Sequence, residues 1–268
     1  MGRTKRTIVI VAFTFVSCST PMIPATTPTS EVTTLRLYAT TASAPLMNDL
    51  TASYSQLYPY TFDIVTGNYE SLLQGLNNGD IPYFLSNHLD EDIPWAAPVG
   101  QDGIAIIVHP DNPLTDLTIE QLRSIYQGYV PNWSQLGGND VEIRIISRED
   151  GSGTRVEFER LVMGDRRTTL AAQIAPSSSA VVSSVARLPG GIGYVSMAYL
   201  DASVQPLLID GAAPTPDAVY DNTYPLRSTL YFVGLEEPQD EYRVFIGWVQ
   251  SPAGQAVVAR HYAPLLRP

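Results

Sequence analysis

The segment REDGSGT, residues 148 to 154, combines side chains and glycines that suit the binding of an anion. A strand-like run, EIRIIS, leads into it, and a helix-like run starts at Thr154. The first N–H groups of a helix have no partner within the helix and carry about half a positive charge, so they attract anions. Ser152 and Thr154 add hydroxyl donors, and Gly153 lets the backbone come close to a ligand. Arg148 adds a planar guanidinium, which matches phosphate-like oxyanions.

Asp150 is expected to hold the guanidinium of Arg148 in place. On these residues alone a second interpretation stays open, in which the segment is a capped helix and the arginine forms only a surface salt bridge. A serine nucleophile fits poorly, because Asp150 stands where the Gly-x-Ser-x-Gly pattern needs its first glycine. No motif links Ser152 to any of the three histidines either. The residues favour binding over catalysis, and we expect no enzyme.

The whole chain is acidic, with 27 Asp and Glu against 16 Lys and Arg in 268 residues and a net charge of −11. Binding of nucleic acid needs a basic face, and the only lysine is Lys5, so nucleic acid is not an expected partner. An anion cradle built from helix N-termini and one arginine needs no such face. The single cysteine excludes an internal disulfide, so the fold depends on its core.

The first residues have the pattern of an export signal. Basic residues at positions 3, 5 and 6 precede a short apolar run, Thr7 to Val16, which is too short to span a bilayer. Cys18 follows a small residue, so we expect a signal peptide over residues 1–17 and lipid attachment at Cys18. An ordinary cleaved signal is the alternative, because Phe15 stands where a lipoprotein signal usually carries leucine. Residues 18–32, rich in Pro, Thr and Ser, are expected to form a flexible linker.

The remainder, residues 33–268, alternates strand-like and helix-like runs. Strands are expected at residues 33–39, 61–65, 81–86, 103–110, 142–147, 191–197 and 229–233. Helices are expected from residue 45, over leucines 72, 73 and 76, at 117–128, 154–164 and 180–188, and as a pair at the C-terminus. This alternation predicts a parallel α/β fold.

Several motifs in this region occur in the order of a known family. They are DGIAIIVHPDNPLTDLTIEQL, NWSQLGGNDVEIRIISREDGSGTRVEFERLV, GGIGYVSMAYLD, YPLRSTLYFV and FIGWVQSPAGQAVV. Together they resemble the phosphate-binding subunit of bacterial phosphate ABC transporters over nearly all of residues 35–265. The resemblance implies a type II periplasmic binding protein: two α/β lobes joined by two crossing strands, with a ligand cleft between the lobes. The crossings would be 103–110 and 224–233, with lobe 1 at 33–103 and 224–268 and lobe 2 at 104–223.

The resemblance also implies a set of ligand-binding residues. Arg148, Ser152, Gly153 and Thr154 match the main phosphate loop, and Asp150 matches the acid that orients the arginine. Further contacts would come from Thr40, Thr41, Asn87 and Ser177. Two places depart from the family pattern. Tyr69 and Glu70 stand where small hydroxyl residues are usual, and Asn87 replaces an aspartate that in some members accepts the proton of hydrogen phosphate.

The implied function is that of an extracytoplasmic, membrane-anchored lipoprotein, at the cell surface or in the periplasm. It would bind inorganic phosphate and deliver it to the membrane subunits of an ABC permease. It would act as a monomer, with no cofactor, no metal and no chemistry on the ligand. Two alternatives stay open: the same fold binding sulfate, tungstate or an organic phosphate, and a sensor or scaffold that does not transport.

Overall fold

The computed structural model describes residues 1–2 and 32–267. Nearly all of the predicted signal peptide and linker, and the lipid attachment predicted at Cys18, therefore lie outside the described residues. Residues 32 onward form one compact unit. Among the described residues, no helix has both the length and the apolar composition needed to cross a bilayer.

The elements follow the predicted order of strands and helices. The strands are β1 (Thr33–Thr40), β2 (Tyr60–Gly67), β3 (Tyr83–Ser86), β4 (Trp95–Val108), β5 (Asp116–Leu117), β6 (Arg144–Arg148), β7 (Gln173–Ala175), β8 (Gly191–Ser196), β9 (Gln205–Pro206), β10 (Leu208–Ile209), β11 (Arg227–Gly234) and β12 (Ala263–Pro264). The helices are α1 (Ala44–Leu57), α2 (Tyr69–Asn77), α3 (Ile119–Tyr126), α4 (Gly153–Phe158), α5 (Ser178–Val185), α6 (Pro216–Tyr220), α7 (Asp240–Gln250) and α8 (Pro252–Val258). Short 3₁₀ helices η1 (Trp133–Leu136) and η3 (Met197–Tyr199) and the π-helical η2 (Glu159–Met163) complete the set.

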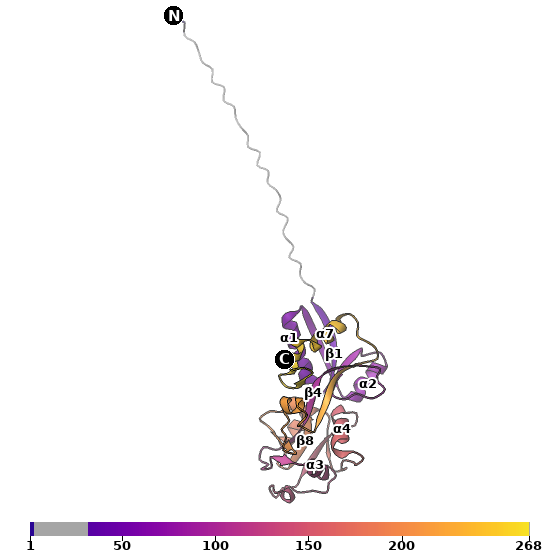
Figure 1. Ribbon diagram of the computed structural model, residues 1–268, viewed down its shortest axis with the longest axis vertical. Helices are drawn as coiled ribbons and strands as arrows, with labels where there is room; N and C mark the ends of the chain where they lie inside the picture. The colour runs from indigo at the N-terminus through magenta and orange to yellow at the C-terminus, as the bar shows by residue number, and fades with distance from the viewer. Residues whose placement is uncertain (3–31, 268) are drawn as a thin grey trace. The chain divides into compact units, whose positions relative to one another are not determined.

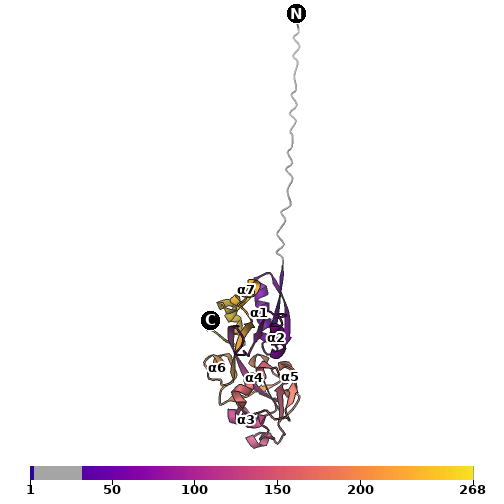
Figure 2. The ribbon, with the colours of Figure 1, turned by 90° about the vertical axis from the view of Figure 1, so that its right-hand side faces the viewer.

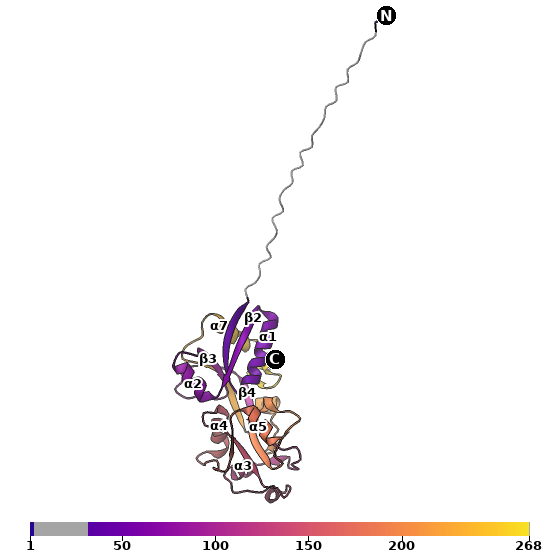
Figure 3. The same cartoon turned by 180° about the vertical axis from the view of Figure 1, so that it is seen from behind.

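One sheet runs through two lobes, in the strand order β2-β1-β3-β11-β4-β8-β6-β7. In the first lobe β1 pairs in parallel with β2 and β3, and α1 and α2 pack against these strands. In the second lobe β6 pairs in parallel with β7 and β8, and α4 and α5 pack against them. Figure 1 and Figure 3 show α1, α2 and β1 at one end of this unit and α3 and α4 at the other. The view in Figure 2 shows the same separation, with α5 beside α4.

Strand β4 joins the lobes. Residues 95–103 pair with β11, and Ile104 to Val108 pair with β8 in the second lobe. The sequence predicts only the second part, because Pro98 and Gly100 interrupt the strand pattern. The register shows why both are tolerated: a bulge at Val99 separates the pairs of Pro98 and Gly100 with β11. The lobe boundaries at 103/104 and 223/224 stay a prediction.

The core contains the apolar residues that the sequence patterns place inside. Residues 104–108 of β4 are completely buried, as expected for a strand near the centre of a covered sheet. The large aromatic side chains of Trp133, Phe245 and Trp248 are also buried and pack in this core. Thr118 and Gln121 form a capping box at the start of α3.

Candidate functional site

A small cavity lies where the two lobes meet. It is lined by Thr40, Thr41, Ala42, Asn68, Tyr69 and Asn87 from the first lobe and by Arg148, Ser152, Gly153 and Thr154 from the second. These residues follow the carboxyl ends of strands β1, β2, β3 and β6, which is where ligands bind in open α/β sheets. Helices α1, α2 and α4 all begin there, so their N-termini add positive potential. The fold brings seven of the eight predicted ligand-binding residues to this cavity; Ser177 does not line it.

Arg148 is the only cationic side chain that lines the cavity, and it is 2% exposed. It is the last residue of β6, and its backbone N–H donates to the hydroxyl of Tyr194 at 3.2 Å. Its Nη1 donates to Ser178 Oγ and its Nη2 donates to Thr41 Oγ1, both at 3.1 Å. The bond to Thr41 crosses from the second lobe to the first, so this guanidinium already links the two halves of the cleft.

The acid that holds Arg148 is Glu149, not the predicted Asp150. Nε and Nη2 of Arg148 each donate to one carboxylate oxygen of Glu149, at 2.8 Å. Asp150 has a 95% exposed side chain and pairs with Arg155 instead. Gly151, with φ of +78°, turns the chain directly after Asp150 into the start of α4. The prediction for Asp150 is therefore wrong in its partner, although the predicted carboxylate–guanidinium pair exists one residue earlier.

The predicted contact from the serine run after Pro176 also moves by one residue. Ser177 caps α5, and its hydroxyl accepts a hydrogen bond from the N–H of Ala180 at 3.2 Å. Ser178, the first residue of that helix, is fully buried and accepts the hydrogen bond from Arg148. The sequence offered two adjacent serines of similar chemistry, and only the phase of the helix start decides which one faces the arginine.

The start of α4 presents its donors to the cavity. Ser152 is the N-cap, with its hydroxyl accepting from the N–H of Arg155 at 3.4 Å. The backbone at Gly153 approaches the first lobe so closely that an added Cβ would lie 2.9 Å from Cβ of His88. Only glycine fits this approach without displacement of a neighbour. The next hydroxyl, that of Thr154, accepts from Nδ2 of Asn87 across the cleft at 3.2 Å.

Asn87 follows β3 and is 1% exposed. Its amide nitrogen bonds to Thr154, while its Oδ1 has no hydrogen-bond partner among the described residues. A buried acceptor without a partner is costly, so it indicates a position where a ligand can donate a proton. This acceptor occupies the place where the family resemblance puts an aspartate.

The loop that contains Tyr69 and Glu70, which departs from the family pattern, does not put a negative charge on the cavity. Asn68 caps α2, and the buried ring of Tyr69 packs edge-on against Phe84 and His88. Glu70 is exposed and does not line the cavity. Its backbone N–H donates to the carbonyl of Gly151 at 3.1 Å, which adds another contact between the lobes. The repulsion between the Glu70 carboxylate and an anion in the cavity is therefore weakened by distance and solvent.

Tyr199 is a site neighbour that the sequence did not reveal. It lies on η3 of the second lobe, and its hydroxyl donates to the backbone carbonyl of Thr41 in the first lobe. Thr41 thus receives two hydrogen bonds from the second lobe, one from Tyr199 and one from Arg148. The tyrosine stands in the matched motif GGIGYVSMAYLD, but nothing in its spacing indicates that it contacts Thr41.

A family model described as the PBP superfamily domain matches residues 24–253. The chain belongs to this superfamily. Among curated relatives, the phosphate-binding protein PstS of Bacillus subtilis is 36% identical over 150 residues, which is 56% of this chain and 50% of that protein. PstS of Pseudomonas aeruginosa is 34% identical over 197 residues, covering 64% of this chain and 60% of that protein. The chain thus spans about half of the length of the first relative and 60% of the second.

Solved structures of the superfamily agree with the fold. A protein from Clostridium perfringens, described as a phosphate ABC transporter substrate-binding protein with bound phosphate, has a TM-score of 0.81 and 29% identity. The match covers 87% of this chain and 100% of that one. An ABC-type phosphate transport receptor from Vibrio cholerae has a TM-score of 0.68 and 27% identity, with coverage of 85% and 98%. The expected two-lobe periplasmic binding protein fold is confirmed.

Proposed function

We propose that this chain is the extracytoplasmic binding protein of an ABC importer and that it holds inorganic phosphate between its lobes. The observation that carries the proposal is Arg148, a buried arginine that lines a cavity formed by both lobes. The names of the relatives and the phosphate bound to the Clostridium perfringens protein support the choice of ligand.

The number of donors is sufficient for tight binding. Micromolar affinity corresponds to about 8 kcal/mol, and a charge-assisted hydrogen bond contributes roughly 1.5 to 3 kcal/mol net. Four or five such bonds therefore suffice before the costs of binding are subtracted. The proposed donors to the anion are the guanidinium of Arg148, the N–H groups and hydroxyls at the start of α4, and the hydroxyls of Thr40 and Thr41.

Asn87 is the proposed contact that favours phosphate over sulfate. Hydrogen phosphate carries a proton that it can donate to Oδ1 of Asn87, whereas sulfate carries none at neutral pH. A neutral amide does not repel sulfate as a carboxylate would, so the selectivity should be lower than with an aspartate at this position.

Binding without catalysis is the expected mode of action. The hydroxyl of Ser152 is engaged as the cap of α4, and both ring nitrogens of His88 face carboxylates rather than a serine. We further propose the remaining features that the sequence predicts: lipid attachment at Cys18, an extracytoplasmic location, action as a monomer and delivery to ABC membrane subunits.

Isothermal titration of the unit from residue 32 onward with phosphate, sulfate and tungstate tests the proposal. We expect phosphate to bind with the highest affinity, in a single site. Preference for tungstate or sulfate would assign the cleft to another oxyanion. The absence of heat with phosphate at millimolar concentration, together with no competition, would contradict the proposal.

A further inference from the structure

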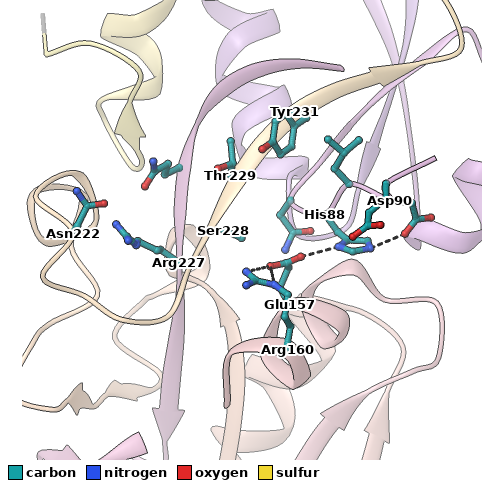
Figure 4. A pocket seen from close by; sticks show the side chains of 13 residues that line it. His88, Asp90, Glu157, Arg160, Asn222, Arg227, Ser228, Thr229 and Tyr231 are labelled. Atoms are coloured by element: carbon teal, nitrogen blue, oxygen red, sulfur yellow. Dashed lines mark hydrogen bonds and ion pairs between the residues drawn. The ribbon is translucent and has the colours of Figure 1, made fainter. Parts of the chain in front are cut away.

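A histidine bridges the lobes beside the cavity. His88 directly follows Asn87 in the first lobe, and its Nδ1 lies 2.7 Å from Oε1 of Glu157, which is on α4 in the second lobe. Its Nε2 lies 2.9 Å from Oδ1 of Asp90 on its own loop. Figure 4 shows the imidazole between the two carboxylates, with Arg160 on the far side of Glu157.

The two carboxylates require a particular protonation state of the ring. A neutral imidazole has one N–H donor and one nitrogen with a lone pair, so it can donate to only one of the two carboxylates. The other carboxylate then faces a lone pair, which is unfavourable. The imidazolium form donates from both nitrogens and satisfies Glu157 and Asp90 together. The geometry therefore matches the protonated ring.

The surroundings support this protonation state. Burial alone lowers the pKa of His88, but its hydrogen bonds with Glu157 and Asp90 and their negative charges outweigh burial and raise the pKa above its ordinary value. Burial alone raises the pKa of Glu157, but hydrogen bonds with His88 and Arg160 bring it below the ordinary value. The titratable and charged groups near His88 are Tyr69 on α2, Asp90 and Glu91 on its loop, Glu157 and Arg160 on α4 and η2, and Arg227 on β11.

The cluster is open to solvent protons. His88, Asp90, Glu157, Arg160 and Arg227 line a cavity of about 540 Å³ between the lobes and the crossing strands. The His88 side chain is nevertheless only 11% exposed. Among the described residues, no group of three His, Cys, Asp or Glu side chains is arranged to hold a metal ion.

The bridge is next to residues proposed to hold the anion. Asn87 precedes His88 in the chain, and Thr154 precedes Glu157 by about one helical turn. The bond from Asn87 to Thr154 runs across the cleft beside the bond between His88 and Glu157. A change in the histidine–glutamate distance therefore moves both ends of that neighbouring contact.

We propose that His88 and Glu157 are positioning residues that hold the lobes closed around the anion, and that phosphate affinity decreases when His88 loses its proton. This inference rests on the proposed function. Opening of the lobes separates His88 from Glu157 but leaves Asp90 nearby on the same loop. Closure thus adds one carboxylate partner, and the closed form binds the proton of His88 more tightly than the open form does.

The direction of the pH effect follows from this difference. A group that binds its proton more tightly in the closed form stabilises that form fully below its open-form pKa. The stabilisation is lost as the pH rises through the closed-form pKa. Each unit of difference between the two pKa values corresponds to a factor of about ten in the closing equilibrium.

The test is titration calorimetry of the full chain with inorganic phosphate, at several pH values from about 5.5 to 8.5. It measures whether the bond between His88 and Glu157 contributes to phosphate affinity. Phosphate changes its own charge in this range, so each variant is compared with the wild type at the same pH. We expect His88→Gln to weaken binding about tenfold at the acidic end, because it removes a charge-assisted bond, and much less at the alkaline end. His88→Arg keeps a positive charge at every pH, so its phosphate affinity should match that of the wild type at the acidic end and exceed it at the alkaline end.

The matched control is His261→Gln, because His261 is a 59% exposed histidine that lies 3.9 Å from Asp49. Equal effects of His88→Gln and His261→Gln on phosphate affinity would overturn the inference. It would also be overturned if the ratio of the His88→Gln dissociation constant to the wild-type one did not change with pH. NMR titration of the His88 ring gives a readout that needs no phosphate: its pKa should decrease in Glu157→Gln. An unchanged ring pKa would contradict the proposed interaction between His88 and Glu157, whereas a wild-type protein that does not bind phosphate would contradict the proposed function.

Discussion

The guanidinium of Arg148 donates two hydrogen bonds of 2.8 Å to the carboxylate of Glu149, the next residue in the chain. Adjacent residues of a regular strand point to opposite faces, so this pairing needs the change of direction at the end of β6. It fixes the plane of the guanidinium and leaves Nη1 and Nη2 directed to Ser178 and Thr41. The arginine is therefore oriented before any ligand arrives, which reduces the ordering cost of binding.

Replacement of Arg148 should abolish anion binding. Arg148→Ala removes the only cationic side chain of the cavity and leaves the Glu149 carboxylate without its partner, so we expect phosphate affinity to fall by at least about a hundredfold. The control is Arg144→Ala, on the same strand, where the side chain is 59% exposed and pairs with Glu142. Calorimetry should show loss for the first variant only, and retained affinity in Arg148→Ala would place the anion elsewhere.

The two acids after Arg148 should differ in their effects. Glu149→Gln removes the charge that holds the guanidinium, and we expect phosphate affinity to decrease by about tenfold. Asp150→Asn changes an exposed residue that pairs with Arg155, so its effect should be close to zero. Phosphate dissociation constants of both variants, measured in the same buffer, show which of the two acids holds Arg148. A stronger effect of Asp150→Asn would contradict the assignment of Glu149 as the arginine's partner.

A methyl group at Gly153 should prevent full closure. The added Cβ of Gly153→Ala would lie 2.9 Å from Cβ of His88, closer than real Cβ contacts, so the lobes must shift apart. Gly247→Ala is the control, because a Cβ there has nothing within 4 Å. We expect weaker phosphate binding and a larger radius of gyration by small-angle scattering for Gly153→Ala alone. Unchanged values for both variants would show that closure tolerates the methyl group.

An acid at position 87 should increase the selectivity for phosphate. In Asn87→Asp the carboxylate can accept the proton of hydrogen phosphate but repels sulfate, which has no proton to donate. We expect the ratio of sulfate to phosphate dissociation constants to increase by about tenfold or more. Calorimetric competition between the two anions measures this ratio. A ratio that stays at the wild-type value would mean that Asn87 does not face the ligand.

Asp102 should make stability depend on pH. It is fully buried in β4, and burial raises its pKa to about 7. Because the folded state binds this proton more tightly than the unfolded state, the free energy of unfolding decreases as the pH rises from the ordinary aspartate value to about 7. Asp102→Asn should remove this dependence and raise the melting temperature at pH 8 more than at pH 5. Equal shifts at both pH values would exclude a buried carboxylate that titrates in this range.

Sequence reasoning predicted the longer strands and helices and the strand–loop–helix segment around Arg148, because these depend on local patterns. The position of Arg148 at a strand end and of Ser152 at a helix start follows directly from the motif. The partner of the arginine did not follow, because the direction of Glu149 and Asp150 depends on the turn at Gly151. The choice between Ser177 and Ser178 likewise depends on one residue of helix phase.

Contacts between the lobes were the least predictable feature. His88 and Glu157 are 69 residues apart, and Tyr199 is 158 residues from Thr41. No local sequence pattern indicates contacts between residues so far apart in the chain. From its sequence neighbours alone, a histidine in a loop is as plausible on the surface as in a contact between lobes. The sequence did not predict the first half of β4, because Pro98 and Gly100 are unusual in a strand. The bulge accommodates the proline, and the close approach of the Ala263 carbonyl leaves no room for a side chain at position 100.

The lining of the cavity is divided unequally between the lobes. The first lobe contributes uncharged hydroxyl and amide groups, and the second contributes the arginine and the start of α4. In the proposed function the lobes separate at a membrane transporter. The arginine then stays with the start of α4, while the uncharged groups of the first lobe move away. Release in that proposal would need no competitor for the arginine, because separation of the lobes alone would remove the uncharged contacts and expose the anion to water on the side that faces away from Arg148.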